Sequence, residues 1–228
     1  MAKNVTLGDL RSEARERANM TGSGFIKNPV WNGWINKSIQ RLYNILVRSF
    51  GEDYYFKEAD ISIVSGTEEY DLPTDFYKLL GVDLKIGTKR QDRIGIEKFL
   101  WKDRNRYSYR PGGFVGRSFR YRMMGGSIIF VPEPTGANTV TLSYIRTATD
   151  LVVDSDSFDG INGFEEWVIL DVAIKARIKE ESDVSDLVLE RNIIREEIKS
   201  DAKARDRGEG NRVSDVNGFE SIDDYGTF

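Results

Sequence analysis

The sequence predicts an α+β protein: mainly an α-helical bundle of about four helices, with a β-rich central insertion and an extended C-terminal tail. Apolar residues recur at three- and four-residue spacing near both ends of the chain, alternate with polar ones in the middle, and show neither period after residue 207. Segregated runs of helices and strands are typical of α+β proteins. We therefore expect residues 1–55 and 160–207 to form a helical bundle domain, residues 56–150 a β-rich insertion and residues 208–228 the tail.

Two helices are predicted within the first fifty residues. Thr6 can cap the first, and Asp9 then lies in its first turn, near the positive end of the helix dipole. Asn28-Pro29 predicts a second start, because proline is favoured at the first helical position, and Gly51 predicts its end. The apolar stripe of this second helix consists of Trp31, Trp34, Ile35, Ile39, Leu42, Leu46 and Phe50.

The middle of the chain is predicted to be rich in strands. Three segments alternate apolar and polar residues in whole or in part: residues 56–64, 80–86 and 139–146. The dipeptide Gly125-Gly126 lies between two further runs and suits a tight turn, so residues 120–131 are expected to form a β-hairpin. Single helical turns are expected at residues 75–79 and 96–102.

The helical period returns after Gly163. Trp167, Leu170, Ala173 and Ile178 define one face of a third helix, and we expect the tryptophans on such stripes to belong to the core. A fourth helix is predicted to follow Ser182-Asp183 and to run to about Arg207. The order of elements is therefore two helices, a strand-rich middle, two helices and a tail.

The composition argues against catalysis. The chain has no cysteine and no histidine, which removes disulfides, thiolate sites, the commonest general base and the commonest transition-metal ligand. A net charge of −4 does not favour a dedicated nucleic-acid binder, and no segment has the roughly 18 consecutive apolar residues of a membrane span. We expect no enzymatic activity, no catalytic residue, no metal site, no cofactor and no membrane contact.

Short motifs recur in a characteristic order and spacing across most of the chain. These motifs are Thr6-Leu7-Gly8-Asp9-Leu10-Arg11, Trp34-Ile35-Asn36, Tyr70-Asp71-Leu72-Pro73, Asp75-Phe76-Tyr77-Lys78-Leu79, Lys179-Glu180-Glu181-Ser182-Asp183 and Arg205-Asp206-Arg207-Gly208. By their order and spacing, the chain resembles tailed-bacteriophage head-to-tail adaptor proteins, also called connectors.

This resemblance implies a structural virion protein at the head-to-tail junction, or neck, made in the host bacterial cytoplasm. Such adaptors form a homo-oligomeric ring, commonly of twelve copies, under the portal protein. The ring continues the DNA channel, contacts packaged double-stranded DNA non-specifically and provides the attachment site for tail or nozzle proteins. The C-terminal segment would clasp the portal, and the β insertion would face the tail. No catalysis is implied.

Two basic segments are candidate channel or subunit-interface residues. The first lies between residues 102 and 122, where arginines alternate with aromatic residues: Arg104, Arg106, Arg110, Arg117, Arg120 and Arg122. The second recurs every four residues along the last helix: Arg191, Arg195, Lys199 and Lys203. Like charges at this spacing repel each other mildly, and an anionic neighbour would relieve the repulsion. DNA, an acidic neighbouring subunit and plain solvent all remain open as their surroundings.

The tail after residue 207 combines acidic residues with aromatic ones. Composition alone favours disorder in the free monomer. Aromatic residues are good interface anchors, so the portal-interface candidates are Phe219, Tyr225 and Phe228. Two other functions stay open: a different neck or tail component of the head-closure or tail-terminator type, and a DNA-binding module that uses residues 102–122.

Overall fold

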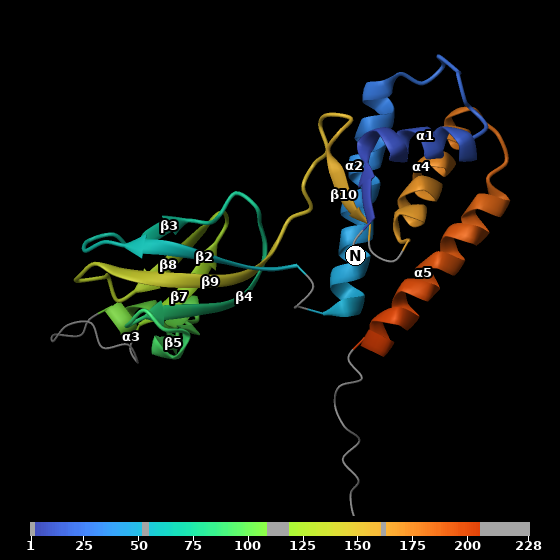
Figure 1. The fold of residues 1–228 in the computed structure, drawn as a ribbon. Coiled ribbons are helices and arrows are strands. Elements are labelled where there is room, and N and C mark those ends of the chain that lie inside the picture. Colours follow the sequence, from blue (N-terminus) through green and yellow to red (C-terminus); the bar gives the residue numbers. More distant parts are fainter. Residues whose placement is uncertain (1–2, 52–54, 109–118, 161–162, 206–228) are drawn as a thin grey trace, which may run out of the picture.

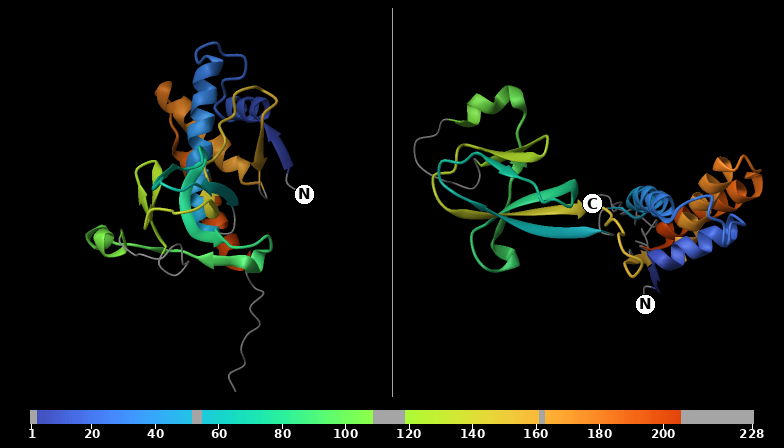
Figure 2. Two further views of the ribbon diagram at one scale, coloured as in Figure 1. Left: turned by 90° about the vertical axis from the view of Figure 1, so that its left-hand side faces the viewer. Right: turned by 90° about the horizontal axis from the view of Figure 1, so that it is seen from above.

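The computed structural model describes residues 3–51, 55–108, 119–160 and 163–205. Figure 1 shows a helical region and a sheet region, and the view from above in Figure 2 places them end to end. Each region has its own cluster of buried apolar side chains. The chain enters the sheet region after residue 51 and returns to the helical region after residue 146.

The helical region is built from α1 (Leu7–Arg17), α2 (Asn28–Phe50), α4 (Glu165–Lys179) and α5 (Ser185–Arg205). The predicted cap of α1 is confirmed, because the Asp9 amide donates to Thr6 Oγ1 at 3.1 Å and the Asp9 carboxylate accepts from the Thr6 amide at 3.1 Å. The predicted cap of α2 is off by one residue. Lys27 is its N-cap, Pro29 lies in the first turn, and the Asn28 side chain accepts a bond from Arg15 instead.

Helix α4 lies at the centre of the helical region. Its apolar residues point in every direction and are almost all buried, as in a helix that neighbours enclose on several sides. Helices α1, α2 and α5 all pack against it. The expectation that tryptophans belong to the core is confirmed for Trp31 and Trp167, which are 1% and 5% exposed, whereas Trp34 is only partly buried.

A two-stranded antiparallel sheet also belongs to the helical region, and the sequence analysis missed it. It pairs β1 (Lys3–Thr6) with β10 (Ser157–Gly160), so that Val5 lies opposite Phe158. Both strands are only four residues long, too short to show a period. This sheet holds the residues that precede α1 against the segment that precedes α4 (Figure 1).

The sheet region contains two four-stranded sheets. The first has the order β2-β9-β4-β5, with β2 (Phe56–Ile63), β9 (Asn138–Arg146), β4 (Phe76–Lys85) and β5 (Arg93–Gly95). The second has the order β3-β8-β7-β6, with β3 (Glu69–Asp71), β8 (Ser127–Val131), β7 (Arg120–Met124) and β6 (Glu97–Lys98). A short helix, α3 (Arg104–Ser108), accompanies them.

Most predicted strands are confirmed. The hairpin over residues 120–131 is confirmed, with Met124 opposite Ser127 and Gly125 at a φ of 60°, which suits glycine. The helical turn expected at residues 75–79 is wrong, because β4 begins at Phe76. The turn expected at residues 96–102 is wrong in its first half, where β6 forms, and only a 3₁₀ turn follows at Trp101–Asp103.

The predicted fold class is wrong, because it gives helices too large a share and strands too small a share of the chain. Strands account for about 28% of the described residues and form several sheets, so the chain is strand-rich rather than a helical bundle with a small insertion. The physical reason is local. Long amphipathic helices give a strong sequence signal, whereas strands of two to five residues give almost none. The domain boundaries at residues 55, 150 and 160 stay a prediction, and the tail over residues 208–228 lies outside the described residues.

The two large sheets share one hydrophobic cluster. Val140, Leu142 and Tyr144 of β9 and Phe130 of β8 all belong to it and are fully buried. The Phe130 ring stacks on Phe119 with centroids 5.0 Å apart. Among the described residues, no helix is long and apolar enough to cross a membrane.

We predict that Phe130→Ala destabilises the protein by about 3–5 kcal/mol, because it removes a buried ring that both sheets enclose. Urea unfolding followed by near-UV circular dichroism measures this. The control is Met124→Ala on β7, whose side chain is 40% exposed and which should change the free energy of unfolding by about 0.5 kcal/mol or less. Equal losses for both variants would contradict the shared core.

Candidate functional site

A buried carboxylate joins three helices of the helical region. Asp171 of α4 is 2% exposed. Its Oδ2 accepts a hydrogen bond from Ser38 Oγ of α2 at 2.7 Å and pairs with Lys175 Nζ at 2.7 Å. Its Oδ1 accepts from Arg191 of α5 at 2.8 Å, and the Arg41 guanidinium lies 3.7 Å from Oδ2. We call these five residues the Asp171 cluster.

The electrostatics of the Asp171 cluster favour charged partners. Burial pushes the pKa of Asp171 upward, but hydrogen bonds from Lys175, Ser38 and Arg191 outweigh it, so the pKa lies below its ordinary value. Burial also lowers the pKa of Lys175, and its bond to Asp171 offsets that only in part. The carboxylate is therefore ionised at neutral pH and holds α2, α4 and α5 together.

A pocket of about 320 Å³ opens beside this cluster, between α2, α4 and α5. We call it the arginine pocket. Four arginines line it, with Asp171, Trp167 and Ile45 among the other lining residues: Arg41 and Arg48 from α2, and Arg191 and Arg195 from α5. Arg41 and Arg48 are seven residues apart, two turns along one helix face.

Positive charge in the arginine pocket exceeds negative charge. Asp171 is the one acidic residue among its lining residues, and it is already paired with Lys175 and Arg191. Within the described part of the chain, Arg48 and Arg195 have no carboxylate within ion-pair distance. In the same part of the chain, the buried Nε1–H of Trp167 has no hydrogen-bond acceptor. The arrangement can bind an anion through unpaired guanidinium groups.

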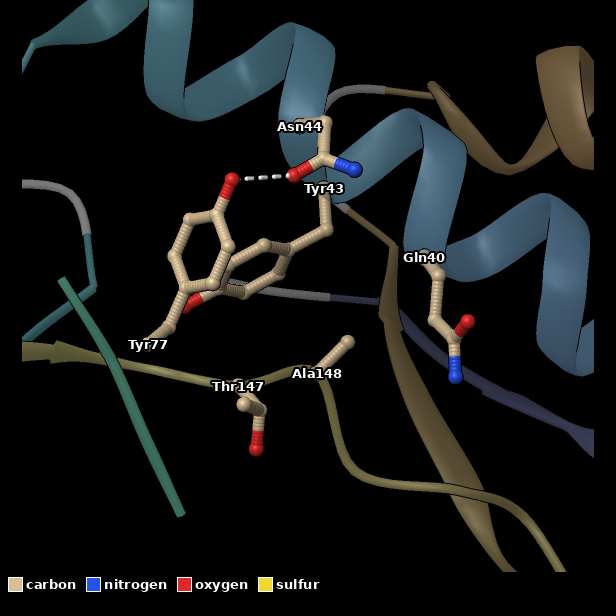
Figure 3. A pocket seen from close by; sticks show the side chains of 6 residues that line it. All are labelled: Gln40, Tyr43, Asn44, Tyr77, Thr147 and Ala148. Carbon is tan, nitrogen blue, oxygen red and sulfur yellow. Dashed lines mark hydrogen bonds between the residues drawn. The ribbon is translucent and has the colours of Figure 1, made fainter. Parts of the chain in front are cut away.

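A second pocket lies where the sheet region meets α2. Figure 3 shows Tyr77 of β4 pointing toward Asn44 of α2, and the Tyr77 hydroxyl donates to Asn44 Oδ1 at 2.8 Å. This junction pocket has a volume of about 230 Å³, and Tyr43, Thr147 and Ala148 also line it. The side chains that line it end in hydroxyl, amide and methyl groups, and none of them is charged. The bond between Tyr77 and Asn44 joins the sheet region to α2.

Tyr43 of α2 also contacts the end of the sheet region. Its ring stacks on Tyr55 with centroids 4.0 Å apart, and its hydroxyl donates to the backbone oxygen of Arg146 at the end of β9. Burial raises the pKa of Tyr43, so the hydroxyl stays protonated and keeps its role as a donor. Nearby, burial and a hydrogen bond to Asp75 raise the pKa of Tyr144 to about 12.

The predicted basic residues between 102 and 122 are partly described. The Arg104 guanidinium lies 5.1 Å from the ring centroid of Trp101, and that of Arg122 lies 5.9 Å from it. Arg120 pairs with Glu97 and lies 5.6 Å from the ring centroid of Tyr107. The described arginines thus contact aromatic and acidic neighbours of the same chain. Arg110, Arg117 and the side chain of Arg106 lie outside the described structure.

The basic residues of the last helix have separate surroundings. Arg191 belongs to the Asp171 cluster, Arg195 lines the arginine pocket, and Lys199 pairs with Glu196 at 2.6 Å. The side chain of Lys203 is outside the described structure, as are Phe219, Tyr225 and Phe228. Whether any of these residues contacts a partner stays a prediction.

Apart from Arg191, sequence reasoning missed the Asp171 cluster, namely Ser38, Arg41, Asp171 and Lys175. It also missed Arg48 of the arginine pocket. A signal existed for Asp171, because it is a lone acid inside the apolar run Val168-Ile169-Leu170-Asp171-Val172, and a charge buried in such a run needs a partner. Arg41 and Arg48 are seven residues apart. This spacing also occurs on ordinary solvated helix faces, so it gives no specific signal. Among the described residues, no group of three acids could hold a metal ion.

We predict that Asp171→Asn destabilises the protein by about 3–5 kcal/mol at pH 7, because it leaves Lys175 and Arg191 partly buried without their counter-charge. The folded-state pKa of Asp171 is lowered, so its stabilising effect is present above the unfolded pKa of about 3.9 and is lost as pH falls through the folded value. Urea unfolding between pH 7 and pH 2.5 should therefore show the wild-type and variant curves converging at low pH.

The matched control is Glu197→Gln, which neutralises an exposed acid on α5. It should change the free energy of unfolding by about 0.5 kcal/mol or less at pH 7. A constant difference between wild type and Asp171→Asn across the whole pH range would show that the carboxylate charge does not stabilise the fold.

Comparison with known proteins identifies a family. A family model described as SU10 adaptor protein matches residues 5–188, which include the sheet region and the helical region as far as the first turn of α5. No curated protein matches the chain significantly. The match supports a phage adaptor, a structural protein of the virion neck that interacts with portal and tail components. It covers most of the 228 residues, so the chain belongs to the SU10 adaptor protein family of phage head-to-tail adaptors.

Proposed function

We propose that this protein forms a ring under the portal, continues the DNA channel and provides the attachment site for the tail. The observation that carries the proposal is the family match, which spans both regions of the fold rather than one module. An adaptor must contact a protein above it, a protein below it and its own neighbours. The end-to-end arrangement of two regions (Figure 2) offers separate surfaces for these contacts.

The helical region is the proposed site of contact between neighbouring copies in the ring. Three of its large apolar side chains are well exposed, namely Ile178 of α4 and Leu189 and Ile193 of α5, at 58%, 63% and 60%. Leu189 and Ile193 are one turn apart on the same face of α5. Burying such residues against another copy is favourable, at about 25 cal/mol per Å² of apolar surface.

The sheet region carries the proposed contact with tail or nozzle proteins. Trp101 is 44% exposed between Arg104 and Arg122, and Leu100 beside it is 56% exposed. Tryptophan and arginine together are typical of the residues that dominate the energy of protein interfaces. We propose that this surface, with Arg120, contacts protein, and that Arg106, Arg110 and Arg117, which lie outside the described structure, contact the same kind of partner. Packaged DNA would instead be contacted from the helices, through Lys199 and Lys203.

Phe219, Tyr225 and Phe228 are the proposed anchors on the portal. We predict that the intact chain binds assembled portal protein from the same genome and that a version truncated after Gly208 loses at least tenfold in affinity, because the aromatic anchors are removed. A pull-down followed by biolayer interferometry measures this. Circular dichroism of the truncated protein must match that of the intact protein.

Alanine variants of the full-length chain distinguish the contribution of the aromatic anchors from that of the length of the tail. Phe219→Ala combined with Tyr225→Ala should weaken portal binding by tenfold or more, at roughly 1–2 kcal/mol for each truncated anchor. Val213→Ala combined with Ile222→Ala is the matched control within the same tail and should bind like the intact chain. If no form of the protein binds assembled portal, the adaptor proposal fails.

A further inference from the structure

The arginine pocket has the positive charge of an anion-binding site. Arg48 and Arg195 face the same pocket from two different helices, and within the described residues neither has an acidic partner. Asp171, the acid among the lining residues, is committed to Lys175 and Arg191. Both side chains are exposed to solvent, and each guanidinium can donate two hydrogen bonds to one carboxylate.

The pocket also suits an apolar group. Trp167 and Ile45 line it together with the arginines, and the buried Trp167 Nε1–H has no acceptor among the described residues. The chemistry therefore favours an occupant that places an acidic group beside an aromatic or aliphatic one.

Such a sequence exists in this chain. Residues 219–225 read Phe-Glu-Ser-Ile-Asp-Asp-Tyr, in which Phe219 is followed by Glu220 and Tyr225 is preceded by two acids. A duplex DNA backbone would bring phosphates without apolar groups, so it fits the arginines but not Trp167 and Ile45. Charge and apolar character together favour the peptide.

The connection is long enough. Helix α5 rises about 15 Å from Arg195 to Arg205, at roughly 1.5 Å per residue. The fourteen residues 206–219 span up to about 46 Å when extended, at roughly 3.3 Å per residue. The segment after α5 can therefore return to the pocket of its own chain.

We propose that the arginine pocket binds residues 219–225 of the same chain, with acidic groups of the segment between Arg48 and Arg195 and an aromatic ring against Trp167. In the free protein this contact holds the segment on the helical region. The inference concerns the free chain and does not depend on the portal, so its failure and the failure of the proposed function are separate results.

The test uses the full chain, which has no cysteine of its own. Nitroxide labels are placed on Ser200→Cys in α5 and on Gly226→Cys, and pulsed electron paramagnetic resonance gives the distance distribution between them. We expect one narrow component at low salt. Arg48→Glu with Arg195→Glu should abolish that component, and 0.5 M NaCl should weaken it by screening the ion pairs.

Two further variants make the test specific. Lys27→Glu with Lys98→Glu changes the charge by the same amount at exposed sites that do not line the pocket, and it should leave the narrow component intact. Glu220→Lys with Asp223→Lys and Asp224→Lys should abolish it. Combining these tail reversals with Arg48→Glu and Arg195→Glu should restore it, because the ion pairs are then re-formed with opposite sign.

Three results would overturn the proposal. The first is a broad distribution in the otherwise unchanged chain at low salt. The second is a narrow component that survives Arg48→Glu with Arg195→Glu while these variants remain folded by circular dichroism. The third is a broad distribution together with binding of a short DNA duplex that the same two substitutions abolish, which would assign the pocket to phosphate.

Discussion

The helical region depends on one buried charge. An ionised carboxylate inside a helix core is costly unless it is paired and hydrogen-bonded, so Asp171 requires cations and a hydroxyl at fixed positions. Ser38 on α2 and Arg191 on α5 meet that requirement from two neighbouring helices, with Lys175 on α4 itself. Apolar packing is non-directional, whereas hydrogen bonds weaken steeply as their geometry departs from the ideal, so these bonds restrict how α2 and α5 can sit against α4.

The arginine pocket adjoins this cluster. Arg41 and Arg191 are held near the cluster by Asp171, and Arg48 and Arg195 extend the basic surface along α2 and α5 beyond what one carboxylate can neutralise. The residues that line the pocket therefore carry more positive than negative charge. An acidic group can bind such a surface reversibly, because ion pairs with arginine are strong when water is excluded and weak when they are exposed to salt.

The sheet region is attached to this core through α2. Tyr43 stacks on Tyr55 and binds the end of β9, while Asn44, one residue further on, binds Tyr77 of β4. One helix thus contacts the helical core on one face and the sheet region on another. The family match includes the sheet region and most of the helical region.

The sequence by itself determined the long helices, the hairpin around Gly125 and the family, because capping residues, amphipathic stripes and turn glycines act locally. It also indicated Arg191 and Arg195 as notable residues. Only the tertiary structure decided the strand-rich balance of the fold, since β1, β6 and β10 are too short to show a period and exist through pairing with distant residues. The pairing of Asp171 with Ser38 and Arg191 and the convergence of Arg48 with Arg195 were likewise tertiary, because each joins helices far apart in the chain.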